Sequence, residues 1–185
     1  MSHFIASGRN WEHVLVIVLL LGRLGDVGST YLVTPTLRLE GNPIARKFGW
    51  RFALLTIAVC LLPYYSTALG MVAIVVSFLA TASNLSRGWI VRALGEAEYL
   101  RILQRAAAAS TFREAIAFVL GSSGTFALAG LVLLLISGGP EMWPYWFALG
   151  VILHACAMAI FGCVSLRRLY RQGFRGGAVS GVPVE

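Results

Sequence analysis

The stretch WEHVLVIVLLLGRLGDVGSTYLV (Trp11–Val33) decides the class of fold to which this chain belongs. Its centre, Val14–Gly22, is an uninterrupted apolar run, and the whole stretch matches the ~20 residues that a helix needs to cross a ~30 Å hydrocarbon core. The chain as a whole is 58% apolar and only 12% charged, whereas a soluble domain has roughly 25% charged residues. The sequence therefore predicts an all-α, polytopic membrane helical bundle.

Four more apolar segments complete the predicted bundle. Asn42-Pro43 is typical of a helix start, with asparagine as the N-cap and proline at the first helical position. We expect one transmembrane domain over residues 1–175 and a flexible tail at 176–185. The expected spans are 11–33, 43–65, 71–93, 114–137 and 143–166, with a surface or extended helix at 94–112. The alternative is four spans plus a re-entrant hairpin around Pro63.

The basic residues predict an orientation. A net charge of +7 in a soluble protein would suggest nucleic acid as a partner, but in a membrane protein basic residues mark the cytoplasmic loops. With five spans and Arg23 inside the membrane, Arg9 is the single cation on one side. The other side holds thirteen: Arg38, Arg46, Lys47, Arg51, Arg87, Arg92, Arg101, Arg105, Arg113, Arg167, Arg168, Arg171 and Arg175. We therefore expect an inner (cytoplasmic) membrane protein with its N-terminus outside, its C-terminus in the cytoplasm, contacts to anionic lipid headgroups, and no nucleic acid.

The first span carries two charges at membrane depth, Arg23 and Asp26. A charge near the bilayer centre costs at least ~2.5–3.5 kcal/mol, so it needs a partner or water. Residues three apart meet on one helix face, and Thr30 extends that face. The pattern predicts either an ion pair that fixes helix packing or part of a ligand site.

A second polar cluster combines Glu40 and Asn42 with Arg46, Lys47 and Arg51. A helix N-terminus attracts anions, and these cations would add to that attraction. One interpretation is a site for a phosphate or lipid headgroup at the inner leaflet. The other is a capping motif beside ordinary cytoplasmic charges.

The third expected span carries a polar stripe, and the fourth a stripe of small residues. Asn84, with Arg87 beside it, can hydrogen-bond across helices or share a cavity with Asp26 and Glu40. Small residues at intervals of four permit close approach of another helix, of this chain or of another subunit. These residues are Ala117, Gly121, Thr125 and Ala129.

His154 stands in the middle of the last span. It is interpreted as a hydrogen-bonded packing histidine, with a proton carrier or a ligand to a buried group as alternatives. The three cysteines lie in apolar segments without a C-x-x-C pair, so no metal site is expected. The sequence leaves the question of a cofactor open and contains no recognisable set of catalytic side chains.

The spacing Asp26-x3-Thr30, followed by Glu40-x-Asn42-Pro43, resembles an uncharacterised family of small prokaryotic membrane proteins with an Asp…Thr…Glu-x-Asn-Pro signature. The resemblance covers about the first third of the chain. It implies that these five residues act together, and it implies no activity.

Three hypotheses of function follow. The first is a non-catalytic subunit or assembly component of a larger membrane complex, in contact with other subunits or copies of itself. The second is binding or transport of an anionic or amphipathic molecule or lipid at the inner leaflet. The third is a lipid-modifying membrane enzyme with Asp26 and Glu40 as an acid–base pair.

Overall fold

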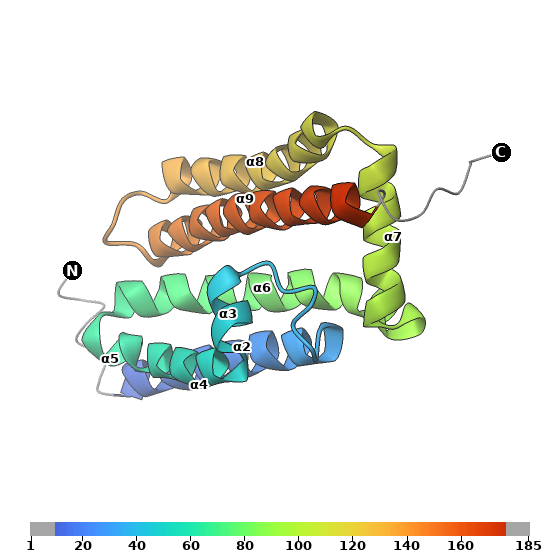
Figure 1. Cartoon of the computed structure of the whole chain (residues 1–185). Coiled ribbons are helices and arrows are strands. Elements are labelled where there is room, and N and C mark those ends of the chain that lie inside the picture. The colour runs from blue at the N-terminus through green and yellow to red at the C-terminus, as the bar shows by residue number, and fades with distance from the viewer. Residues whose placement is uncertain (1–9, 177–185) are drawn as a thin grey trace.

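The computed structural model describes residues 10–176, which are helical with short connections and form no strand. Four helices are long and apolar enough to cross a membrane: α2 (Asn10–Val33), α6 (Thr67–Leu94), α8 (Phe112–Ile136) and α9 (Trp143–Gly176) (Figure 1). The all-α prediction is confirmed, and these helices fit a multi-pass membrane protein. Arg9 and, apart from Gly176, the predicted tail at 176–185 lie outside the described residues.

The predicted second span is where the structure differs most from expectation. Residues 43–65 do not form one continuous helix but four short pieces. These are α3 (Pro43–Phe48), α4 (Trp50–Ile57), the 3-10 turn η1 (Ala58–Leu61) and α5 (Leu62–Tyr65). Gly49 separates α3 from α4 with a φ of +63°, a left-handed conformation that favours glycine. The apolar part, Trp50–Tyr65, has fewer than 18 residues, so the count of five spans is not confirmed by helix length.

Helices α2 and α6 pack side by side and run in the same direction. An added Cβ on Gly22 would lie 3.2 Å from the Cβ of Ser77, and one on Gly88 would lie 3.2 Å from Cγ2 of Val33. The contact therefore advances along both helices together, from Gly22 to Val33 and from Ser77 to Gly88. Because α2 and α6 are parallel, the chain between the end of α2 and the start of α6 must run back along the length of both helices.

The segment Trp50–Tyr65 makes this return (Figure 1). Thr56 of α4 bonds to Arg23 near the middle of α2, and Tyr64 of α5 bonds to His13 near its start, at 2.6 Å. The segment therefore runs antiparallel to α2 over most of that helix. The chain then turns into α6. At this turn Pro63 is buried and packs tightly against the start of α6, where a Cβ on Gly70 would lie 2.8 Å from Cγ of Pro63.

Helices α8 and α9 form an antiparallel hairpin that packs on α6 through α9. A Cβ on Gly130 would lie 2.7 Å from Cγ1 of Ile152, and one on Gly162 would lie 2.7 Å from Cγ1 of Val119. In Figure 1 the hairpin forms one layer and α2 to α6 form the other, with α7 (Glu96–Ala109) bridging their ends. Helix α9 continues to Gly176, ten residues beyond 166, where the fifth membrane span was predicted to end.

Candidate functional site

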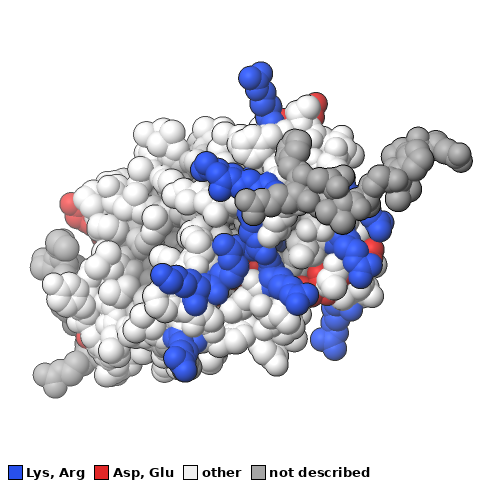
Figure 2. All heavy atoms as spheres, viewed as in Figure 1, with Lys and Arg blue, Asp and Glu red and all other residues white. Residues whose placement is uncertain are grey.

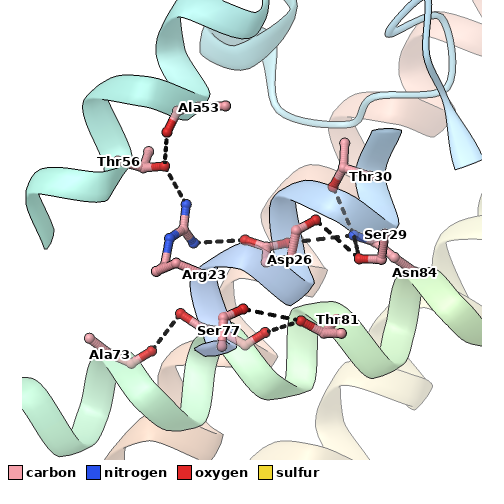
Figure 3. Close-up of polar contacts among 11 residues, drawn as sticks. Arg23, Asp26, Ser29, Thr30, Ala53, Thr56, Ala73, Ser77, Thr81 and Asn84 are labelled. Atoms are coloured by element: carbon pink, nitrogen blue, oxygen red, sulfur yellow. Dashed lines mark hydrogen bonds and ion pairs between the residues drawn. The ribbon is translucent and has the colours of Figure 1, made fainter. Parts of the chain in front are cut away.

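A polar cluster joins α2, α4 and α6 inside the bundle (Figure 3). Nη1 of Arg23 donates to Oδ2 of Asp26 at 2.7 Å, and Nη2 donates to Oγ1 of Thr56 at 2.5 Å. The hydroxyl of Thr56 in turn donates a hydrogen bond to the carbonyl oxygen of Ala53 at 2.7 Å. The predicted contact between Arg23 and Asp26 is confirmed, and Thr56 is a partner that the spacing of the sequence did not indicate.

Asn84 extends the cluster from α6 back to α2 (Figure 3). Its Nδ2 donates to Oγ1 of Thr30 at 2.9 Å and lies 3.3 Å from Oγ of Ser29 and 3.5 Å from Oδ1 of Asp26. Four predicted site residues, Arg23, Asp26, Thr30 and Asn84, are thus brought together. Ser29 was not predicted, although it stands next to Thr30 in the sequence.

The ion pair of the cluster is electrically neutral, and its two charged side chains are largely buried. The side chains of Arg23 and Asp26 are 15% and 20% exposed, so each charge is compensated by the other at a depth where an unpaired charge is costly. Both oxygens of Asp26 already have a partner, Arg23 on one and Asn84 on the other. Nε of Arg23 is the buried nitrogen that has no partner among the described residues. This arrangement suits a structural ion pair better than a group that must exchange protons.

Glu40 and Asn42 form a local capping motif rather than part of this cluster. Oδ1 of Asn42 accepts from the N–H groups of Ile44 at 2.9 Å and Ala45 at 3.4 Å, and Oε1 of Glu40 accepts from the N–H of Asn42 at 2.8 Å. The predicted N-cap and the proline that follows it are confirmed. The helix that they start, α3, is only six residues long.

The predicted cations do not close around that motif. Arg46 and Arg51 are exposed, as is Lys47. Arg87 bonds instead to its own helix, with Nε 3.3 Å from the carbonyl oxygen of Ser83 and Nη2 3.4 Å from Oγ of Ser83. In Figure 2 Lys and Arg lie over the middle and the α7 end of this face, away from the end where α2, α6 and α9 begin.

Glu96 makes a set of contacts that the sequence did not predict. Its carboxylate accepts from the hydroxyl of Thr34, from the hydroxyl of Thr36 at 2.6 Å and from the backbone N–H of Arg38 at 3.0 Å. Burial by itself raises the pKa of this carboxyl, but the hydrogen bonds together outweigh it and hold the pKa below its ordinary value. Glu96 therefore ties the start of α7 to the loop after α2. The polar run Thr34-Pro35-Thr36, whose N–H and hydroxyl groups need acceptors, was the available signal.

The stripe of small residues on α8 faces away from the rest of the chain. Ala117, Gly121, Thr125 and Ala129 are all exposed, and a Cβ added to Gly121 would meet nothing within 4 Å. Gly130, which packs on α9, is nine residues from Gly121, so at ~3.6 residues per turn the two glycines lie on opposite sides of α8. Of the two expected roles, packing within this chain is wrong for these four residues.

His154 is buried between α9 and α8, with 6% of its surface exposed. Its ring stands edge-on to Phe126 at a centroid distance of 5.9 Å. It has no hydrogen-bond partner in the described part of the chain, so the predicted hydrogen bond is not observed. Among residues 10–176 no group of three His, Cys, Asp or Glu side chains could hold a metal ion.

Comparison with known proteins does not assign this site to a family. No protein-family model, no curated protein and no solved structure matches the chain. The resemblance of Asp26, Thr30, Glu40, Asn42 and Pro43 to a family signature therefore stays a prediction. What the structure contributes is that two of these residues join the polar cluster and the other three cap a short helix.

Proposed function

We propose that this protein is a non-catalytic component of a larger assembly in the cell membrane and that helix α8 docks against a helix of another subunit. The observation that carries the proposal is the outward stripe of Gly121 and its small neighbours. In lipid, helices associate where small residues allow close backbone contact, because no hydrophobic force drives them together. Such a stripe provides a face on which the backbone of another helix can lie close to α8.

The large side chains of the same face support this role. Phe118 and Leu128 lie beside the stripe and are 80% and 62% exposed. Large side chains thus project on either side of the gap at Gly121, and the side chains of a second helix can pack into that gap. The same proposal includes an anchor to the membrane surface: exposed arginines at the α7 end of the protein attract anionic lipid headgroups.

The proposal includes five membrane crossings, with the N-terminus outside and the C-terminus in the cytoplasm. It is supported by the parallel course of α2 and α6, since Trp50–Tyr65 must then cross in the opposite direction. A length of 16 residues corresponds to ~24 Å, which suits a segment that crosses beside longer helices. A re-entrant hairpin would instead return the chain to the side from which it came.

The other two hypotheses have weaker support. The six-residue α3 and the exposed side chains of Arg46 and Arg51 form no enclosed site for an anion. An acid–base pair needs two available carboxylates, whereas Asp26 is held by Arg23 and Asn84, and Glu40 accepts from the backbone of Asn42.

Gly121→Leu tests the docking face. A Cβ added at Gly121 meets nothing within 4 Å in this chain and this face of α8 is exposed, so the variant should keep the stability of the wild type. After extraction in a mild detergent we expect the wild type to co-purify with other membrane subunits or with itself, and Gly121→Leu to elute as a lone chain. Leu120→Phe, a change outside the stripe on the same helix, is the matched control and should behave as wild type.

Two results would contradict the proposal. One is a wild type that elutes as a lone, stable chain from native membranes. The other is a Gly121→Leu variant that keeps every partner of the wild type.

A further inference from the structure

A half-open cleft of about 340 Å³ lies between α6, α8 and α9, apart from both the polar cluster and the outer face of α8. Its volume falls at the lower end of the range for small-molecule sites, ~300–1,000 Å³. The walls are mostly apolar, with a few polar groups. The lining residues are Leu79, Ala82, Ser83, Ser86, Phe126, His154 and Met158.

His154 gives the cleft a polar group without a partner. The residue is more than nine-tenths buried and lines the cleft, and it forms no hydrogen bond with any residue between 10 and 176. Its ring nitrogens are not among the fully buried polar atoms that lack a partner, so they reach the open space of the cleft, where a ligand can bond to them. A ligand that accepts a hydrogen bond from the imidazole N–H would satisfy His154.

Ser83 adds a second donor to the same wall. Its Oγ accepts a hydrogen bond from Nη2 of Arg87 at 3.4 Å. The hydroxyl hydrogen of Ser83 is therefore available to donate a hydrogen bond into the cleft. Arg87 also places a positive charge next to Ser83. No residue that lines the cleft is acidic, so the cleft favours oxygen acceptors over amines or other cations.

Depth limits the charge of the ligand. His154 is eleven residues from Trp143 at the start of α9, which corresponds to ~16 Å of helix. An ionised headgroup is costly at that depth, whereas a neutral carbonyl group is not. The half-open side of the cleft leaves room for an apolar tail in the surrounding lipid.

We propose that this cleft binds the head of a neutral, membrane-soluble molecule that carries a carbonyl oxygen, with His154 donating a hydrogen bond to that oxygen and Ser83 supporting it. A quinone ring and a glycerol ester share this chemistry. The site is separate from the docking face of α8, so failure of one proposal leaves the other standing.

The test uses the full-length protein in lipid nanodiscs with ¹⁵N-labelled histidine. Decyl-benzoquinone and monoolein are the two carbonyl-bearing probes, and decane is the control without a carbonyl. We expect a saturable shift of the His154 side-chain resonance with at least one carbonyl probe and no shift of His13, which lies near the start of α2, does not line the cleft and bonds to Tyr64. The probe that causes the shift identifies the source of the carbonyl.

Two variants measure the contribution of the cleft. His154→Phe keeps an aromatic ring at this position but removes the imidazole N–H donor. The affinity for the probe, measured by calorimetry, should therefore fall roughly three- to tenfold, the effect of one neutral hydrogen bond. Ala82→Phe fills the cleft and should abolish binding, and His13→Phe should leave it unchanged. Absence of a His154 shift with both probes, an equal shift with decane, or full binding by Ala82→Phe would overturn the proposal.

Discussion

The helices within each of the two layers of the molecule are held together by different interactions. Between α2, α4 and α6 the contacts combine close packing at Gly22 with hydrogen bonds between helices, from Arg23 to Thr56 and from Asn84 to Thr30. Between α8 and α9 they are steric, with Gly130 and Gly162 admitting side chains from the facing helix. The difference teaches that hydrogen-bonding side chains can link particular helices, while small residues determine how closely helices approach.

Asp26→Ala should have the largest effect, because it leaves the charge of Arg23 buried without a partner. Loss of one member of a buried pair costs about 3–5 kcal/mol of unfolding free energy. Unfolding by SDS titration in mixed micelles measures this loss. The double variant Arg23→Met with Asp26→Leu should recover most of the stability, and a double variant as unstable as Asp26→Ala would show that the layer does not depend on charge pairing.

Gly130→Ala tests the steric layer, because the new Cβ would lie 2.7 Å from Ile152 and 3.2 Å from the carbonyl oxygen of Ala148. Overpacking of this kind costs about 1–3 kcal/mol. Gly121→Ala on the opposite side of α8 is the matched control and should be neutral or slightly stabilising. Equal effects of the two substitutions in the same SDS titration would contradict the packing described here.

Glu96→Gln tests the polar contact at the end of the bundle and is expected to cost about 1 kcal/mol at neutral pH. The pKa of Glu96 in the folded protein lies below its ordinary value of 4.5. Its ionised form therefore stabilises the fold fully above about pH 4.5, and this contribution is lost as the pH falls through the folded-state pKa. Thermal unfolding against pH should show this decline in the wild type but not in Glu96→Gln. Glu98→Gln, which removes only an exposed ion pair with Arg101, should follow the wild type.

Asn84→Ala should have the smallest effect, although Asn84 makes the most cross-helix contacts of the polar layer. Hydrogen bonds between helices in a membrane average about 0.6 kcal/mol, because the polar groups find other partners when the helices separate. The SDS titration used for Asp26→Ala measures this change. A loss as large as that of Asp26→Ala would mean that the amide, and not the ion pair, holds α6 against α2.

Local features of the fold could be predicted from the sequence. The apolar runs predicted the four long helices, and the three-residue spacing of Arg23 and Asp26 predicted their ion pair. Asn42-Pro43 predicted the start of α3. Each of these depends on residues close together in the chain, whose geometry follows from the helix itself.

Contacts between distant segments could not be predicted in this way. Thr56 is thirty-three residues from Arg23, and Glu96 is sixty-two from Thr34. The break at Gly49 was missed because apolar residues continue on the far side of it. These features depend on which helices become neighbours, and nothing in the spacing of a single segment specifies that.

The sequence by itself therefore determined that the chain is an all-helical bundle of membrane-spanning length and which polar groups had to be paired. Only the tertiary structure decided which side of each helix faces its neighbours, as in α8, where Gly130 packs inward and Gly121 faces out. The physical reason is the solvent. In water a polar face marks the outside of a helix, but in lipid both faces are apolar, so hydrophobicity does not specify how the helix is rotated about its axis.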